Sequence, residues 1–187
     1  MLEQAQSIKD YIIEIRRLVH QQPELGYQEV NTAKLVAKQL KALDLSYQTG
    51  IAKTGVIAEI SKGNGPTVLI RADMDALPIH EETGLSFESK IPGVMHACGH
   101  DTHTAMLLGA AKLLTQASFK GTLRFLFQPS EESSYDDPDG FSGAQRVVAE
   151  GLLDDVDAAI GLHQMPTMPT ASIAITKGSV MAQGNRA

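Results

Sequence analysis

A cysteine and three histidines lie close together near the middle of the chain. They are His96, Cys98, His100 and His103, and the cysteine is the only one in the sequence. Thiolate and imidazole groups together suit borderline-soft divalent ions such as zinc. Gly99 separates Cys98 from His100, and the conformational freedom of a glycine lets both side chains face one ion. The segment therefore predicts a metal site with Cys98 and His100 as ligands.

Two other interpretations of this segment are open when it is taken alone. Cys98 can be a small buried apolar residue with His100 at the start of a helix, and the sequence supports this as well as it supports a metal site. Cys98 can also be a nucleophile that uses a histidine as its base. The nucleophile is the weaker alternative, because residues this close in one turn do not readily reach the required geometry with a third orienting group.

Two adjacent carboxylates, Glu131 and Glu132, follow the apolar run 122–127. Neighbouring residues at a strand end point in different directions, so one can bind a metal while the other faces a bound water. A carboxylate beside a metal-held water is the usual general base in hydrolysis. A solvated acidic loop is the alternative, since three aspartates follow within the segment 133–142. The buried strand before the pair favours the catalytic interpretation.

Two aspartates follow another apolar run, 67–72. Asp73 and Asp75 share one strand face by the period of two residues. They could contact metals, or accept a hydrogen bond from a ligating histidine and so fix its tautomer. A turn-forming role before Pro78 is the alternative for one of the two.

The elements that must position these residues alternate between helix and strand. The apolar spacing predicts helices over about 3–20, 28–43, 101–116 and 143–150, and strands over about 56–60, 67–72, 122–127, 158–163 and 172–176. This alternation implies the α/β class, with a mostly parallel or mixed sheet and helices on both of its faces.

Sites in such sheets gather at the carboxyl ends of the strands. Three predicted buried strands end here in ionisable residues: Asp73 and Asp75, then Glu131 and Glu132, then His163. A single histidine is more often structural than a ligand, so the assignment of His163 depends on the other two strands. The recurrence predicts one site shared by the three strand ends.

The composition excludes several classes of protein. The net charge of −6 and the isoelectric point near 5.5 argue against a nucleic-acid partner, which requires a basic surface. The apolar runs are too short to cross a membrane, and the first residues have no basic head or apolar signal core. One cysteine cannot form an internal disulfide, which favours a reducing compartment. We therefore expect a cytoplasmic protein without nucleic-acid or membrane partners.

Four ordered segments carry a resemblance to a known family: Arg71–Pro78, His96–His103, Gln128–Glu132 and Gly161–His163. Together they resemble the dinuclear-metal amidohydrolase and peptidase family that includes hippurate hydrolase, N-acyl-amino-acid amidohydrolases, auxin-conjugate hydrolases and N-acetyldiaminopimelate deacetylase. His20, with the following Pro23–Gly26, also matches the opening segment of this family. The resemblance implies a zinc-peptidase-like catalytic domain.

The resemblance further implies two divalent metal ions, Mn²⁺ or Zn²⁺, with Co²⁺ or Ni²⁺ as further candidates. By position, the residues that resemble the metal ligands are Cys98, His100, Glu132 and His163. Glu131 resembles the general base, and either Asp73 or Asp75 resembles a supporting carboxylate. The implied reaction is hydrolysis of an amide bond in an N-acyl amino acid or short peptide, with Glu131 passing a proton to the leaving amine.

Two departures from the family pattern shape the expected function. The segment 133–142 is longer and more acidic than the short glycine-rich link usual after the glutamate pair. Residues 1–187 match only the N-terminal part of the catalytic domain, without the lid or dimerisation domain through which family members form homodimers. A final catalytic segment with a last histidine ligand is also missing, since no histidine follows His163.

From these departures we expect the 187-residue chain alone to bind metal weakly and to hydrolyse little. The alternative function is that of a non-catalytic metal-binding fragment that associates with a full-length homologue.

Overall fold

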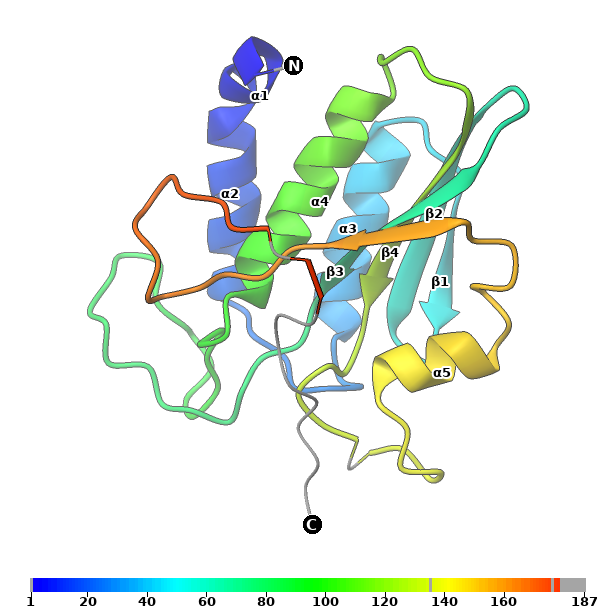
Figure 1. The fold of residues 1–187 in the computed structure, drawn as a ribbon. Coiled ribbons are helices and arrows are strands. Elements are labelled where there is room, and N and C mark those ends of the chain that lie inside the picture. Colours follow the sequence, from blue (N-terminus) through cyan, green and yellow to red (C-terminus); the bar gives the residue numbers. More distant parts are fainter. Residues whose placement is uncertain (1, 135, 176, 179–187) are drawn as a thin grey trace.

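A mixed sheet lies at the centre of the fold, with its strands in the order β1-β2-β4-β3-β5 (Figure 1). The structure is a computed structural model that describes residues 2–134, 136–175 and 177–178. The strands are β1 (Tyr47–Ile51), β2 (Gly55–Lys62), β3 (Thr67–Asp73), β4 (Gly121–Gln128) and β5 (Ala158–Gly161). β2 runs antiparallel to β1 and β4, whereas β3 runs parallel to β4 and β5.

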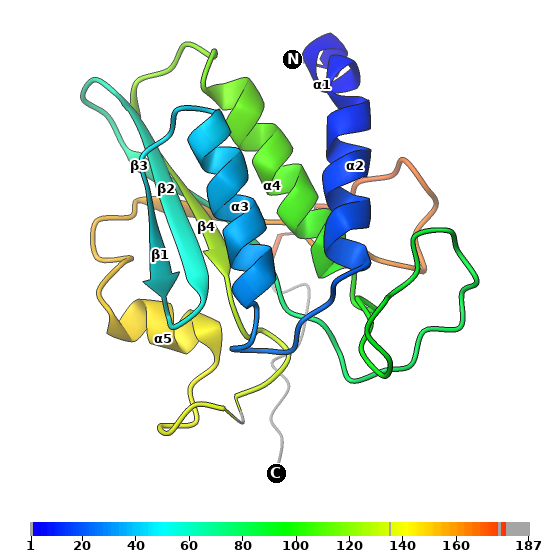
Figure 2. The ribbon, with the colours of Figure 1, turned by 180° about the vertical axis from the view of Figure 1, so that it is seen from behind.

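Helices cover both faces of this sheet, as the sequence predicts. The helices are α1 (Leu2–Ser7), α2 (Lys9–His20), α3 (Val30–Ala42), α4 (His100–Leu114) and α5 (Gly143–Ala149). Figure 2 shows α3, α4 and α2 side by side on one face, and α5 lies on the other. The predicted α/β class with a mixed sheet is therefore confirmed.

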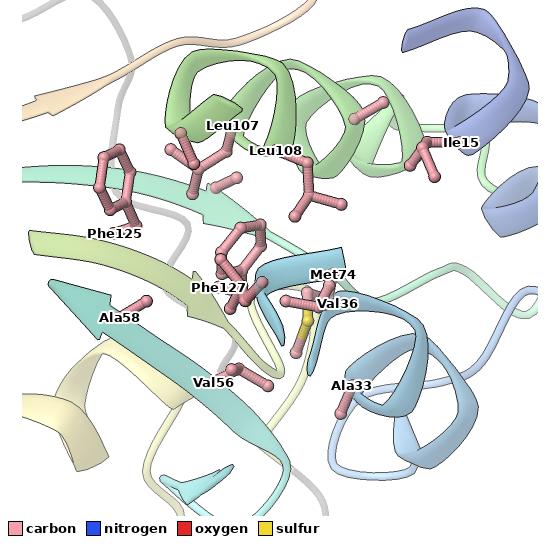
Figure 3. Close-up of a cluster of buried hydrophobic side chains, with 14 of the residues drawn as sticks. Ile15, Ala33, Val36, Val56, Ala58, Met74, Leu107, Leu108, Phe125 and Phe127 are labelled. Carbon is pink, nitrogen blue, oxygen red and sulfur yellow. The ribbon is translucent and has the colours of Figure 1, made fainter. Parts of the chain in front are cut away.

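The apolar core divides into two clusters because β4 is buried on both sides. Phe125 and Phe127 point toward α3 and α4, where Figure 3 shows them among Leu107, Leu108 and Val36. The residue between the two phenylalanines, Leu126, faces the opposite cluster, to which α5 contributes Val147. The near-continuous apolar sequence of β4 is typical of a strand that packs against apolar residues on both faces of the sheet.

Several expected elements differ from those in the structure. The first helix is interrupted at Ile8, which separates α1 from α2, although the apolar spacing is continuous across it. β1 is an edge strand that the sequence analysis missed, because only Ile51 of its five residues is buried. The strand expected over 172–176 is wrong for residues 172–175, which form no strand, and residue 176 lies outside the described residues.

β3 and β5 were expected to be buried strands, and this is only partly right for β3 and wrong for β5. Three of the seven residues of β3 are buried and the other four are half-buried, while all four residues of β5 are exposed. β5 is the last strand of the sheet, and no described helix covers either of its faces. Its apolar residues therefore mark an uncovered end of the sheet. No helix in the described part of the chain is long and apolar enough to span a membrane.

Candidate metal centre

The register of the sheet brings the predicted site residues to one edge. Asp73, the last residue of β3, is paired with Gln128, the last residue of β4. Arg71 of β3 is paired with Gly161, the last residue of β5. The three chain segments that leave these strands carry Asp75, the Glu131–Glu132 pair and His163. The expected convergence at the carboxyl ends of three strands is what the topology produces.

The start of α4 completes this group from the side of the helix layer. Gly99 has a φ of 90°, a left-handed conformation that favours glycine, and His100 is the first helical residue. A Cβ atom at Gly99 would lie 3.0 Å from Cγ of Gln164, so a side chain here would press on Gln164. This turn places Cys98 and His100 against the segment that follows β5.

His100 lies at the centre of the group and is fully buried. Its Nδ1 atom is 2.9 Å from the carbonyl oxygen of Asp75 and 3.1 Å from Oδ1 of the same residue. Because the carbonyl oxygen can only accept, Nδ1 carries the proton and donates it. The lone pair of the neutral ring is therefore on Nε2.

Nε2 of His100 faces three carboxylates without forming a hydrogen bond to any of them. It lies 3.6 Å from Oδ2 of Asp73, 3.7 Å from Oε1 of Glu132 and 4.0 Å from Oε2 of Glu131. Oε1 of Glu132 is likewise buried without a partner among the described residues. A nitrogen lone pair beside an unpartnered carboxylate oxygen is an arrangement that a cation would satisfy.

The remaining predicted ligands lie beside this pair. Sγ of Cys98 is 3.3 Å from Nε2 of His163. The donor atoms of Cys98, His100 and His163 lie within 4.8 Å of one another, as do those of His100, Glu131 and Glu132. Both groups share His100, so the thiol and imidazole donors adjoin the carboxylate donors. The thiol and imidazole donors fit a borderline ion such as zinc, and the carboxylate donors also suit a harder ion such as manganese.

A third group with ligand spacing, formed by Asp73, His100 and His103, is less suited to a metal. Both nitrogen atoms of His103 already have partners: Nδ1 lies 2.6 Å from Oδ1 of Asp73, and Nε2 accepts from the backbone N–H of Gln164 over 3.0 Å. Oδ2 of Asp73 accepts a hydrogen bond from Arg71 over 2.7 Å. His103 and Asp73 are therefore supporting residues in this geometry.

The two aspartates support different histidines, which the sequence could not distinguish. Asp75 binds Nδ1 of His100 and, through Oδ2, accepts the backbone N–H of Glu132 over 2.8 Å. It thus links two predicted ligands, while Asp73 orients His103. Asp75 lies beyond the end of β3, so the period of two residues is not what brings both aspartates to the site.

The charges of the site shift the pKa values of its members. Burial alone would lower the pKa of His100, but the hydrogen bond with Asp75 and the charge of Asp73 raise it to about 9. Burial and the charge of Glu132 raise the pKa of Glu131. Burial, together with the proximity of Glu132, raises the pKa of the Cys98 thiol to about 12. All three shifts favour the protonated forms, so the metal-free chain holds a proton on Nε2 of His100 at neutral pH. A divalent cation would displace that proton and free the lone pair for binding.

A second buried polar cluster adjoins the site, and the sequence analysis missed most of it. Nδ1 of His20 lies 2.7 Å from Oδ2 of Asp101, which also accepts from Nε of Arg16 over 2.6 Å. Nε2 of His20 lies 3.1 Å from Oε1 of Glu81. The sequence signal that could have revealed this cluster was the position of Asp101, directly after the predicted ligand His100. The cluster ties the end of α2 to the start of α4, which places His20 beside the site.

Comparison with known proteins agrees with this geometry. Residues 69–182 match the family described as Peptidase family M20/M25/M40. IAA-amino acid hydrolase ILR1-like 5 of Arabidopsis thaliana is 46% identical over 179 residues, which are 95% of this chain and 40% of that protein. N-acetylcysteine deacetylase of Bacillus subtilis is 45% identical over 183 residues, which are 94% of this chain and 45% of that protein.

The fold is also similar to that of a solved relative. The crystal structure of the YXEP protein of Bacillus subtilis, described as a dinuclear metal binding peptidase, aligns with a TM-score of 0.80 and 45% identity. The alignment covers 88% of this chain and 45% of that one. The chain thus spans less than half the length of these relatives. On the match to residues 69–182 and the shared fold, the chain belongs to the M20/M25/M40 family of peptidases.

Proposed function

We propose that this chain forms the metal-binding face of an amidohydrolase active site. The observation that carries the proposal is a buried pair of possible ligand atoms, Nε2 of His100 and Oε1 of Glu132. They lie 3.7 Å apart, and neither forms a hydrogen bond with the part of the chain that the structure describes. Leaving two such atoms buried without partners is costly, unless a cation binds between them. Membership of a hydrolase family and a relative described as dinuclear support the same conclusion.

The residues proposed to hold the metal ions are those predicted from the sequence: Cys98, His100, Glu132 and His163. A bound divalent ion would polarise the substrate carbonyl and acidify a water molecule. Asp75 would keep His100 in the tautomer that presents a lone pair, and would hold the backbone of Glu132. The chain thus supplies both ligands and the groups that orient them.

Glu131 is proposed as the general base. Its side chain is 43% exposed, compared with 19% for Glu132, so it can reach a water molecule and a substrate. Its Oε2 atom lies 4.0 Å from Nε2 of His100, so the carboxylate borders the proposed metal position while part of it stays open to solvent. Glu131 would take a proton from the attacking water and deliver it to the departing amine nitrogen.

The proposed substrates are N-acyl amino acids or short peptides. Relatives that are 45–46% identical are described as hydrolases of IAA-amino acids, as deacetylases of N-acetylcysteine and as carboxypeptidases. These names share cleavage of an amide bond to an amino acid. Which acyl group is accepted depends on contacts beyond the residues of this site.

Paired substitutions at the two glutamates test the proposal. Glu131→Gln should abolish hydrolysis of N-acetylcysteine or another N-acetyl amino acid while Zn²⁺ or Mn²⁺ still binds, because only the base is lost. Glu132→Gln should weaken metal binding itself. Glu82→Gln, at an exposed loop position, is the control and should change neither. Equal metal affinity in all three variants, measured by isothermal titration, would contradict the proposed ligand set.

A metal-binding role without turnover is the second candidate. It is favoured by the exposed β5 strand, which leads to the proposed ligand His163. The expectation that the chain alone binds metal weakly and hydrolyses little stays a prediction. Manganese-dependent turnover at rates typical of the relatives would contradict it, and turnover that survives chelation would instead indicate Cys98 as a nucleophile.

A further inference from the structure

Glu29 is a fully buried carboxylate that is not among the predicted site residues. It lies at the start of α3, and its two oxygen atoms bind two other parts of the chain. Oε1 accepts a hydrogen bond from the backbone N–H of Ser130 over 2.7 Å. Oε2 accepts one from the hydroxyl of Thr54, in the turn between β1 and β2, over 2.5 Å.

The burial of Glu29 is unfavourable in itself. No lysine, arginine or histidine of the described residues forms a salt bridge with it. Burial accordingly raises the pKa of Glu29 to about 7, against the opposing effect of its hydrogen bonds. A buried carboxylate without a basic partner costs stability, so packing of α3 alone does not explain its presence.

The turn that Glu29 holds has an unusual backbone. Ser130 is buried and has a φ of 47°, a left-handed conformation that is unfavourable for a residue with a side chain. Its carbonyl oxygen accepts from the N–H of Gly143 over 2.9 Å, and its hydroxyl donates to the carbonyl oxygen of Ser133. Gly26 packs against it so closely that a Cβ atom there would lie 2.6 Å from the hydroxyl oxygen of Ser130.

This turn leads directly into Glu131 and Glu132, and carboxylates bind its backbone on both sides of Glu131. Glu29 accepts the N–H of Ser130, and Asp75 accepts the N–H of Glu132. We propose that Glu29 is a positioning residue that fixes the Ser130 turn and thereby aims Glu131 and Glu132 into the metal centre. The inference rests on the proposed function, which gives Glu131 and Glu132 their roles. The coupling between Glu29 and the Ser130 turn does not require a bound metal.

Thr54 has a defined part in this arrangement. Its hydroxyl holds the second oxygen of Glu29, so that the first stays directed at Ser130. A glutamine at position 29 could preserve both contacts, with its oxygen accepting from Ser130 and its amide donating to the Thr54 hydroxyl. An alanine could preserve neither. The two substitutions therefore separate the hydrogen-bonding role from the charge.

Amide hydrogen exchange of the metal-free chain, resolved by residue, tests the coupling. The decisive amide is that of Glu132, whose own acceptor, Asp75, is unchanged in every variant. The measured quantity is the change in the exchange rate of this amide after correction for the change in global stability of the variant. Glu29→Ala should raise the corrected rate by roughly tenfold or more, and Glu29→Gln by less than about threefold. Val36→Ala is the control for general destabilisation, because Val36 is a fully buried residue elsewhere in α3. This substitution should leave the corrected exchange rate of the Glu132 amide unchanged.

Because Glu29→Ala can fail to fold, Thr54→Val provides a second measurement. It removes only the hydroxyl that anchors Glu29, and it should speed exchange of the Glu132 amide by a smaller factor than Glu29→Ala. The proposal would be overturned if the Glu132 amide exchanged as in the unsubstituted chain in both Thr54→Val and Glu29→Ala. An equal rise of its exchange rate in Val36→Ala would also overturn it.

Binding of Co²⁺ separates this inference from the proposed function. In Glu29→Ala the thiolate-to-cobalt absorption band from Cys98 should persist, while the affinity falls toward that of Glu132→Ala. Unchanged affinity in Glu29→Ala would contradict the positioning role. Failure of the unsubstituted chain to bind Co²⁺ would contradict the proposed metal centre, and the exchange measurement would still decide the role of Glu29.

Discussion

Nε2 of His103 accepts a hydrogen bond from the backbone N–H of Gln164 over 3.0 Å, although the two residues are 61 positions apart in the sequence. The other nitrogen of His103 is bound to Asp73 at the end of β3. His103 therefore connects β3 to the segment that follows β5, and Gln164 is the immediate neighbour of His163. A histidine that binds no metal in this geometry thus fixes the position of a predicted ligand.

Replacing His103 should weaken the metal centre without removing a ligand. In His103→Ala the segment around His163 loses its anchor, and we expect the affinity for Zn²⁺ to fall by roughly tenfold to a hundredfold, as for other residues that orient ligands. His80→Ala, at an exposed loop position, is the matched control. Parent-like Zn²⁺ affinity of His103→Ala in a competitive chelator titration would contradict the role.

A comparison of alanine substitutions at Gly99 and Gly84 tests whether the contact of Gly99 with Gln164 matters. Gly99 and Gly84 both have positive φ, but only Gly99 has atoms near the position of an added Cβ, those of Gln164 at 3.0 and 3.1 Å. Gly84→Ala should cost about 1–2 kcal/mol for the backbone alone. Gly99→Ala should cost more and should also lower metal affinity, since it displaces Gln164 and with it His163.

The comparison is made by urea unfolding of both variants under identical conditions. Equal losses of unfolding free energy at the two positions would show that the contact with Gln164 has no energetic effect. A larger loss in Gly84→Ala would contradict the account of this turn.

Glu29 should make the stability of the metal-free chain depend on pH. Its pKa is raised in the folded state from 4.5 to about 7, mainly by burial, so the folded chain holds a proton that the unfolded chain has already released. The free energy of unfolding should therefore fall as the pH rises through this window, by about 3 kcal/mol in all. Glu29→Gln cannot titrate and should lack this component.

Urea unfolding of parent and Glu29→Gln between about pH 4.5 and pH 8 measures the difference. The exposed Glu82→Gln serves as the control and should follow the parent. Parallel stability curves for Glu29→Gln and the parent would mean that the pKa of Glu29 is the same in the folded and unfolded chains, and would contradict the prediction.

Much of the site could be predicted from the sequence because the carboxyl ends of strands are a local signal. The apolar runs before Asp73 and Glu131 marked two strands, and their parallel pairing follows from the helix between them. The Ser142 capping box and Gly151, with its positive φ, bound α5 where the sequence indicated. In each case the residues that define the element lie within a few positions of one another.

The parts that were missed depend on contacts between distant segments. Glu29 meets Ser130 across 101 positions, and His20 meets Asp101 across 81. β1 carries mostly exposed residues, so its sequence lacks the alternation that marks a strand with one buried face. Residues 172–175 include two isoleucines but form no strand, because apolar composition does not supply a pairing partner.

The central claim is that a divalent ion binds at His100, between the thiol-imidazole donors and the carboxylate donors. Anomalous diffraction from crystals soaked in Zn²⁺, collected on both sides of the zinc absorption edge, measures this directly. We expect a peak within bonding distance of Nε2 of His100 and Oε1 of Glu132 that disappears in Glu132→Ala. Zinc peaks only at other positions, or no peak in a crystal of the unsubstituted chain, would contradict it.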